Sequence, residues 1–310
     1  IQDMHNIVEG ALDRVNPAVA KSYRDYRNYK KDFVHMMDDV YTKSQSIRYI
    51  GDKSNANTDS ALVATKRSLI FNELNKSLYQ KFFMTVEELQ ACRDGYIYIH
   101  DMSARRDTMN CCLFNVKDVL TGGFEMGNLW YNEPKTLEVA FDIIGDIVLS
   151  AASQQYGGFT VPSVDLLLEP FAEKSYEKYY RRYIDMGLTA RIADREAMKD
   201  IQKDFDQGFQ GWEYKFNTVA SSRGDYPFIT MTFGTGTGKF AKIASITMLN
   251  VRRKGQGKKN CKKPVLFPKL VFLYDENLHG AGKELEDVFE AGILCSSKSM
   301  YPDWLSLTGE

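Results

Sequence analysis

The sequence has little histidine and no pair of cysteines in a Cys-x-x-Cys pattern. Only 4 of its 310 residues are histidine. Structural zinc sites draw on closely spaced cysteines or on histidines, so we expect no metal site within this chain. The 5 cysteines are an odd number for a secreted disulfide framework, and the polar residues 1–6 do not resemble a signal peptide. These absences predict a cytoplasmic protein with reduced thiols.

The chain also lacks a long apolar run and an excess of charge of either sign. Its most apolar stretch, residues 137–152, contains Glu138, Asp142 and Asp146, which argues against a membrane span. The formal net charge is −1, so there is no overall positive field of the kind that binds duplex nucleic acid. We expect neither a membrane nor a nucleic acid as partner, and any phosphate binding has to be local.

The hydrophobic pattern predicts an α/β protein. A hydrophobic content of 44% in 310 residues allows the core of one large domain or of two ordinary ones. Residues 1–50 are predicted to be helical. Further helices are predicted at 57–82, 136–156, 163–185, 193–219, 240–253 and 283–299, with a short helix opened by a capping box of Thr85 and Glu88. Strands are predicted at 96–100, 111–116, 226–233 and 265–274. Strands separated by helices indicate the α/β class.

Two prolines lead to specific predictions about the elements that contain them. Val161-Pro162 is predicted to start the helix that continues through 163–185, because proline is tolerated in the first turn of a helix. Pro268 lies inside the strand predicted at 265–274, and proline within a strand favours an edge position or a bulge.

Two segments that contain cysteine are apolar and poor in charge. They are RDTMNCCLF at 106–114 and CSSKSMYPD at 295–303. Cys111 and Cys112 are adjacent, so in a strand they point to opposite faces and only one can face a given pocket. A disulfide between such neighbours is strained. Two cysteines from the two segments are candidates to meet in one buried, water-poor pocket suited to hydrogen-atom chemistry.

Cys295 has two interpretations. It follows Val288 by seven residues and so falls near the apolar face of the predicted helix at 283–299. Most buried cysteines are small packing residues, and this one fits that description. The alternative is a thiyl radical site, which needs a dry sulfur in contact with a substrate carbon.

A glycine-rich turn and a basic stretch are candidates for phosphate contacts. FGTGTGK at 233–239 follows a predicted strand and precedes a helix, where backbone N–H groups can cradle phosphate. It is not a Walker A loop, which needs glycine in place of Phe233 and serine or threonine in place of Phe240. A tight turn without a ligand fits equally well. The basic stretch at 252–263 is either a solvated loop or a contact to nucleotide phosphates or a partner.

Several segments together resemble the anaerobic (class III) ribonucleoside-triphosphate reductases. In order, they are RDTMNCCLF, GGFEMGN (122–128) followed by NEP (132–134), SAASQQYGGFT (150–160), YPFITMTFGTGTG (226–238), VLFPKLVF (265–272) and CSSKSMYPD. The Asn-Cys and Cys…MYPD pieces are the specific ones. The resemblance covers the chain from about residue 57 onward.

The resemblance implies a ten-stranded α/β barrel with the active site inside. Residues 1–56 would be a helical N-terminal segment and residues 57–310 the N-terminal portion of the barrel. The family's zinc module and radical glycine do not occur in this chain, so we expect a fragment that is inactive alone. A radical S-adenosylmethionine activase would place the radical on the glycine, and ATP and deoxynucleotides would act as effectors on a homodimer. Residues 122–160 are the candidate effector and dimer region.

The resemblance also implies roles for individual residues. Cys295 would carry the thiyl radical that takes the 3′ hydrogen of the ribose, after which the 2′ hydroxyl leaves as water. Cys111, the cysteine after Asn110, would give a hydrogen from the opposite face of the sugar, with Cys112 as the runner-up. By the same motif, Asn110 would belong to the catalytic residues with Cys295 and Cys111. Formate would supply the remaining electrons. The substrate triphosphate would rest on a turn made by Thr235, Gly236, Thr237 and Gly238.

Two other functions stay open at this point. One is a non-catalytic nucleotide-binding or dimerisation module, which has no need of Cys111 and Cys295. The other is a different glycyl radical enzyme, such as an acyltransferase. Those enzymes place adjacent cysteines on the radical loop, whereas here the adjacent pair comes early and a single cysteine comes late, which favours the reductase.

Overall fold

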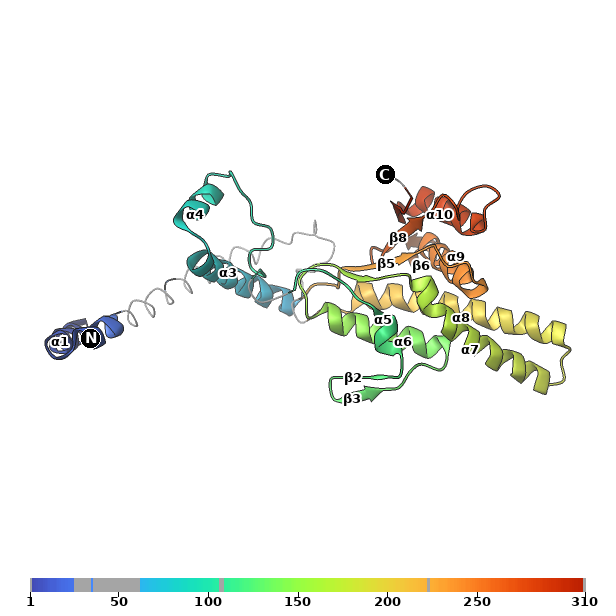
Figure 1. The fold of residues 1–310 in the computed structure, drawn as a ribbon, viewed down its shortest axis with the longest axis horizontal. Coiled ribbons are helices and arrows are strands. Elements are labelled where there is room, and N and C mark those ends of the chain that lie inside the picture. The colour runs from blue at the N-terminus through green and yellow to red at the C-terminus, as the bar shows by residue number, and fades with distance from the viewer. Residues whose placement is uncertain (1, 25–34, 36–61, 106–108, 222–223, 309–310) are drawn as a thin grey trace. The chain divides into compact units, whose positions relative to one another are not determined.

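The computed structural model of the protein describes residues 2–24, 35, 62–105, 109–221 and 224–308 (Figure 1). The chain divides into two compact units. The first is Ile1–Ser54 with Asp59–Asp107, and the second is Asn55–Thr58 with Thr108–Glu310. The units therefore separate near residue 107, whereas the sequence analysis divides the chain after residue 56. That division, into a helical segment and a barrel portion, stays a prediction about the whole protein.

Helices make up most of the described part of the first unit. They include α1 (Gln2–Val15), α3 (Val63–Phe83) and α4 (Val86–Arg93). The helix predicted at 57–82 is confirmed from Val63 onward. Much of the helical stretch predicted at 1–50 lies outside the described residues. In the described ranges, no helix is long and apolar enough to cross a bilayer.

The start of α4 confirms the predicted capping box. The Thr85 side chain accepts a hydrogen bond from the Glu88 backbone N–H (3.2 Å), and the Glu88 carboxylate accepts one from the Thr85 backbone N–H (2.8 Å). The strand predicted at 96–100 is wrong. The backbone N–H groups of Tyr96 and Ile97 both donate to the Ala91 carbonyl, so the chain turns back over the end of α4 instead of extending.

A five-stranded, fully parallel sheet forms the centre of the second unit, in the order β1-β4-β5-β8-β9. The strands are β1 (Cys112–Leu113), β4 (Phe159–Val161), β5 (Ile229–Phe233), β8 (Lys269–Tyr274) and β9 (Asp303–Ser306). Parallel neighbours need long crossover connections, and helices supply them here. The sheet and its helices confirm the predicted α/β class.

Helices alternate with these strands along the chain. They are α5 (Val116–Leu120), α6 (Leu137–Ala152), α7 (Val164–Asp185), α8 (Ala190–Thr218), α9 (Lys239–Lys254) and α10 (Glu286–Ser299). Helix α7 packs against α8 and α9, and α10 packs against α9 (Figure 1). In the central strand β5, Ile229, Met231 and Phe233 are fully buried while Thr230 and Thr232 are half-buried. This alternation places the apolar side chains on the face that joins the core.

Two short antiparallel hairpins accompany the sheet. Strands β2 (Phe124–Met126) and β3 (Leu129–Tyr131) pair with each other, as do β6 (Gln256–Lys258) and β7 (Cys261–Lys263). The second hairpin and the end of α9 together occupy the basic stretch at 252–263, for which the sequence favours no regular structure.

Two of the five parallel strands, β4 and β9, differ from the sequence-based prediction. The helix predicted to start at Val161-Pro162 begins at Val164, because Phe159–Val161 is strand β4 and pairs with both β1 and β5. Strand β9 was not predicted. Strand β8 pairs with β5 on one side and with β9 on the other, so it is an interior strand. Pro268 precedes this strand and lies outside it, and the predicted edge or bulge is wrong.

A buried ion pair joins three elements of the second unit. Arg252 of α9 and Glu213 of α8 lie 2.7 Å apart, and their side chains are 1% and 5% exposed. The Arg252 guanidinium also donates to the Pro268 carbonyl (2.7 Å), and the Gln256 side chain donates to Glu213 (2.6 Å). These hydrogen bonds fix α8, α9 and the segment before β8 against one another.

Glu213→Gln should therefore destabilise the second unit strongly. Breaking one side of a buried ion pair leaves an uncompensated charge, which costs about 3–5 kcal/mol. Urea denaturation followed by circular dichroism measures the loss. Glu196→Gln is the matched control, since Glu196 pairs with Arg195 and Lys199 on the surface and should change stability little. Equal midpoints for the two variants would contradict the structural role of the buried pair.

Candidate functional site

The segment before β1 lies beside the segment before β4. Cys112 pairs in parallel with Phe159, and a bridge between Met109 and Gln155 extends the pairing backward. The Gly157 N–H donates to the Asn110 carbonyl (2.6 Å), and the Cys112 N–H donates to the Gly158 carbonyl (3.1 Å). Main-chain pairing thus sets Asn110 and both cysteines against the Gly157-Gly158 turn.

Cys111 is exposed and is held by this turn. Its Sγ accepts a hydrogen bond from the Gly158 backbone N–H at 3.2 Å. Gly157 has no room for a side chain, because a Cβ there would lie 2.6 Å from the Cys111 Sγ and would also collide with the Asn110 side chain. The glycine is therefore what allows the thiol to approach the backbone.

Cys112 points to the other face, as the strand geometry predicts. It is half-buried against the core, and its thiol donates to the Gln155 side-chain carbonyl at 2.8 Å. The Gln155 amide donates in turn to the Gly158 carbonyl (2.6 Å). Burial, and to a smaller extent the neighbouring Cys111, raises the pKa of the Cys112 thiol. Cys112 is thus a protonated, inward-facing residue, and Cys111 is the accessible one.

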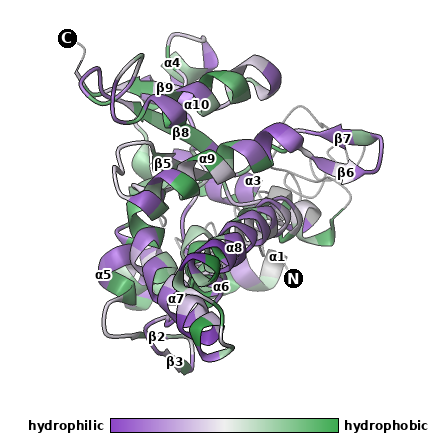
Figure 2. Ribbon diagram, turned by 90° about the vertical axis from the view of Figure 1, so that its right-hand side faces the viewer, coloured by the Kyte–Doolittle hydropathy of each residue, from purple (hydrophilic) through white to green (hydrophobic). Residues whose placement is uncertain are grey.

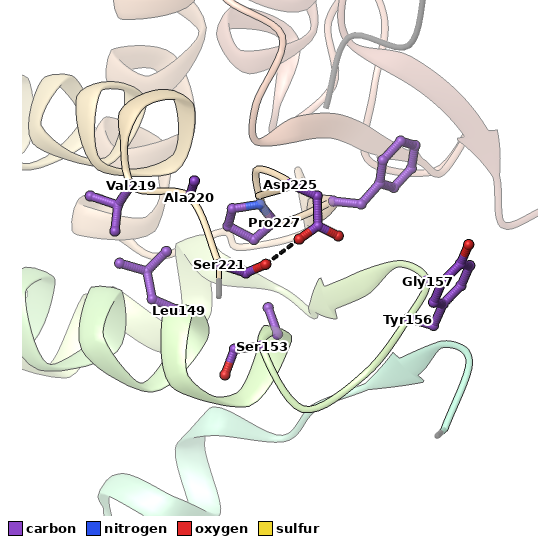
Figure 3. A pocket seen from close by; sticks show the side chains of 11 residues that line it. Leu149, Ser153, Tyr156, Gly157, Val219, Ala220, Ser221, Asp225 and Pro227 are labelled. Carbon is purple, nitrogen blue, oxygen red and sulfur yellow. Dashed lines mark hydrogen bonds between the residues drawn. The ribbon is translucent and has the colours of Figure 1, made fainter. Parts of the chain in front are cut away.

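A cavity of about 240 Å³ opens next to the Gly157 turn (Figure 3). Its walls come from the end of α6, the turn before β4 and the segment between α8 and β5. Among its lining residues are Tyr156 and Gly157 on one side and Ser221 and Asp225, joined by a hydrogen bond, on the other. Ligand pockets commonly reach roughly 300–1,000 Å³, so this cavity suits part of a nucleotide better than a whole one.

Cys295 lies in a different environment. It is fully buried on α10, and its Sγ is 3.3 Å from the Ser299 hydroxyl. Burial is the main cause of the raised pKa of its thiol. Gly292, one turn earlier on α10, faces Phe272 of β8 and Trp304 of β9. The surroundings of Cys295 match those of a small packing residue.

The structure does not bring Cys295 and Cys111 into one pocket. Cys111 adjoins β1 at one edge of the sheet, whereas α10 lies over β8 and β9 at the other. Three strand spacings separate β1 from β8, which corresponds to on the order of 14 Å. The described residues therefore do not place the two cysteines side by side, as a thiyl radical and its hydrogen donor would require.

The glycine-rich turn predicted to bind phosphate is occupied by the protein's own carboxylates. The Gly234 and Gly236 backbone N–H groups both donate to one oxygen of the buried Asp165, at 3.0 Å each. The Ala241 N–H donates to Glu169 (3.3 Å). The Glu169 carboxylate also fills the space that a Cβ at Gly238 would occupy. Two carboxylates at the turn would repel a phosphate.

The predicted phosphate residues are also distant from Cys111 along the strands. Thr235, Gly236, Thr237 and Gly238 follow β5, whereas Cys111 and the cavity of Figure 3 precede β1, β4 and β5. The turn and the cysteine therefore lie at opposite ends of the parallel strands. Phosphate binding at this turn stays a prediction that the arrangement does not support.

Several residues of these sites had no signal in the sequence. Gln155, Asp165 and Glu169 were not singled out, because their partners are 43 to 72 positions away along the chain. In the part of the chain that the structure describes, no three or more histidine, cysteine, aspartate or glutamate residues cluster to hold a metal ion.

Comparison with known proteins places this chain in an enzyme family. A family model for the anaerobic ribonucleoside-triphosphate reductases matches residues 54–310. The chain is 36% identical over 260 residues to the anaerobic ribonucleoside-triphosphate reductase of Enterobacteria phage T4, covering 81% of this chain and 41% of that protein. It is 32% identical over 293 residues to the Salmonella typhimurium (strain LT2) enzyme of the same name, covering 91% and 41%.

Solved structures show the same fold. The anaerobic ribonucleotide reductase of Thermotoga maritima with glycerol in the active site gives a TM-score of 0.59 at 16% identity, covering 92% of this chain and 50% of that one. The same enzyme in complex with dATP and CTP gives 0.56 at 15% identity, covering 90% and 50%. The chain belongs to the anaerobic ribonucleoside-triphosphate reductase family. It spans 35% to 44% of the length of the curated relatives that it matches.

Cys111 should react with iodoacetamide about tenfold faster than Cys112 at pH 8, because only Cys111 is exposed and the thiolate is the reactive form. The raised pKa of Cys112 means that its rate should still be rising at pH 9. Peptide mass spectrometry of the labelled protein measures both rates, with Cys111→Ser as the assignment control. Equal rates at the two cysteines would show that the register of β1 on β4 is not the one described.

Proposed function

We propose that this chain forms part of the catalytic α/β barrel of an anaerobic ribonucleotide reductase. With the rest of the protein it would reduce ribonucleoside triphosphates to 2′-deoxyribonucleoside triphosphates. Membership of the family and the five parallel strands support the proposal. The observation that carries it is the exposed Cys111 thiol, held on the Gly157-Gly158 turn beside a cavity.

Cys111 is the proposed hydrogen donor to the sugar. In the reaction that the family implies, a thiyl radical takes the 3′ hydrogen and the 2′ hydroxyl leaves as water. The Cys111 S–H then gives its hydrogen to C2′. Oxidation of formate to carbon dioxide supplies the two electrons that the loss of the C2′ hydroxyl consumes, which restores the Cys111 thiol. The first cysteine returns its hydrogen to C3′ and becomes a thiyl radical again. The Gly158 N–H orients the sulfur, and the cavity beside Gly157 would hold the ribose end of the substrate.

The other parts of the machinery are proposals on family grounds. They are a glycyl radical outside this chain, a radical S-adenosylmethionine activase, zinc in a C-terminal region and a cytoplasmic homodimer. The Thermotoga maritima enzyme was solved with dATP bound in its specificity site. We propose effector binding by ATP and deoxynucleotides here too, in the region 122–160. That region contains the β2–β3 hairpin, on which Leu129 and Trp130 are exposed, and helix α6.

Among the residues proposed to be catalytic, Cys295 has the geometry that fits its role least well. The thiyl role predicted from the motif needs the sulfur to reach the substrate opposite Cys111. Its burial on α10 and its Ser299 partner support the packing role instead. The two roles give opposite results when the residue is replaced.

Cys111→Ser should abolish dCTP formation from CTP, whereas Cys112→Ser should leave most of it. Serine cannot donate a hydrogen atom as a thiol does, and loss of a reacting group costs on the order of a thousandfold or more. The assay uses the full-length protein, activated anaerobically by its activase. Electron paramagnetic resonance confirms that the glycyl radical forms in both variants. An active Cys111→Ser protein would reject Cys111 as the donor, and a wild type that never makes dCTP would favour a nucleotide-binding module.

Cys295→Ala separates the two roles of that residue in the same assay. Given its full burial, we expect dCTP formation to persist and the free energy of unfolding to fall by about 1–2 kcal/mol, the cost of a small core truncation. Cys295→Ser, which keeps a polar partner for Ser299, is the matched variant. Loss of all activity with an intact glycyl radical signal in both variants would instead establish Cys295 at the chemistry.

A further inference from the structure

The β6–β7 hairpin concentrates positive charge on the surface of the second unit. Lys258, Lys259, Lys262 and Lys263 are all exposed. The hairpin contains no acidic residue, and these four lysines form no ion pair with any described residue. Figure 2 shows the two strands as a mainly hydrophilic ribbon. An unpaired group of cations attracts anions from solution.

A polar cavity of about 260 Å³ lies at the base of this hairpin. Helix α8, the end of α9 and both hairpin strands contribute to its walls. The lining residues with polar side chains are Asp206, Gln207, Gln210, Lys254, Gln256 and Lys262. Two ammonium groups thus face one carboxylate, and the other three side chains are amides that can donate hydrogen bonds.

Two of the amide side chains that line the cavity are already held in place by hydrogen bonds within the protein. The Gln210 amide donates to the Gln256 side chain (3.3 Å), which donates to Glu213 (2.6 Å). Glu213 is held by the buried Arg252. Side chains fixed in this way lose little entropy when they bind.

Two features of the cavity disfavour anion binding, and each has a small electrostatic effect. Asp206 lies 3.5 Å from Lys254, but both side chains are partly exposed, so the pair contributes little and Lys254 can turn toward a ligand. The cavity also adjoins the C-terminus of α9, whose dipole repels anions. The Gly255 N–H already bonds the Val251 and Arg252 carbonyls there, and three basic residues occupy that last turn.

We propose that this cavity binds a polyphosphate group, with Lys262 and Lys254 as its cationic contacts. The other hairpin lysines would attract the ligand from solution. No aromatic side chain lines the cavity to stack a nucleobase, so recognition would rest on the phosphates alone. The site does not include Cys111 or the Gly157 turn, and the proposal does not depend on the proposed reductase activity.

Isothermal titration of the full-length protein with inorganic tripolyphosphate tests this site. Lys262→Gln should weaken binding about tenfold by removing a direct charge contact, and Asp206→Asn should tighten it severalfold by removing the only carboxylate. Lys283→Gln is the matched control, since Lys283 is also exposed but lies outside the hairpin. Because one variant gains and another loses affinity, misfolding cannot imitate the pattern.

Further arms identify the source of the phosphate. The part of ATP binding that depends on Lys262, as distinct from ATP at the proposed effector region, should weaken in Lys262→Gln by the same ratio as tripolyphosphate, because the base would contribute nothing. Three results would overturn the proposal: no tripolyphosphate binding that depends on Lys262, equal weakening in Lys262→Gln and Lys283→Gln, or no gain in Asp206→Asn. Binding of a DNA oligonucleotide that depends on Lys262, without tripolyphosphate binding, would replace it with a nucleic-acid surface.

Discussion

Parallel pairing between β1 and β4 is the interaction on which the candidate site depends. It joins two segments that are 47 residues apart and places the Cys111 sulfur on the Gly158 N–H. Side chains alternate between the faces of a strand, so a shift of one residue would expose Cys112 and turn Cys111 inward. The register therefore selects which of two adjacent, chemically identical thiols is accessible, and Gly157 makes room for it.

Buried carboxylates in the second unit accept hydrogen bonds from groups of the protein that could otherwise bind a ligand. Asp165 is fully buried and accepts two backbone hydrogen bonds from the turn after β5, and Glu213 pairs with the buried Arg252. A charge removed from water has to be compensated by hydrogen bonds or by an opposite charge. The glycine-rich turn donates two backbone hydrogen bonds to one oxygen of Asp165. The turn resembles a phosphate loop in sequence, but this carboxylate already occupies it in the fold.

Similarity of motifs identified the family, but it did not fix the role of every residue within a motif. Cys111 adjoins Gly157, which lines a cavity, so a substrate could reach the thiol that is proposed as the hydrogen donor. Cys295 belongs to an equally specific motif, yet it packs between α10 and its neighbours. A conspicuous cysteine in a family motif can stabilise the fold instead of taking part in the reaction.

The sequence by itself determined the α/β class, the long helices and the capping box at Thr85. It also determined that the side chains of Cys111 and Cys112 point to opposite faces of the strand. These features follow from local periodicity and from interactions between residues close along the chain. Only the tertiary structure decided the strands Phe159–Val161 and Asp303–Ser306, which are too short for a periodic signal and exist because neighbouring strands pair with them. It also decided that Asp165 fills the glycine-rich turn and that Cys295 lies far from Cys111. Such contacts join residues many positions apart, and no local pattern encodes them.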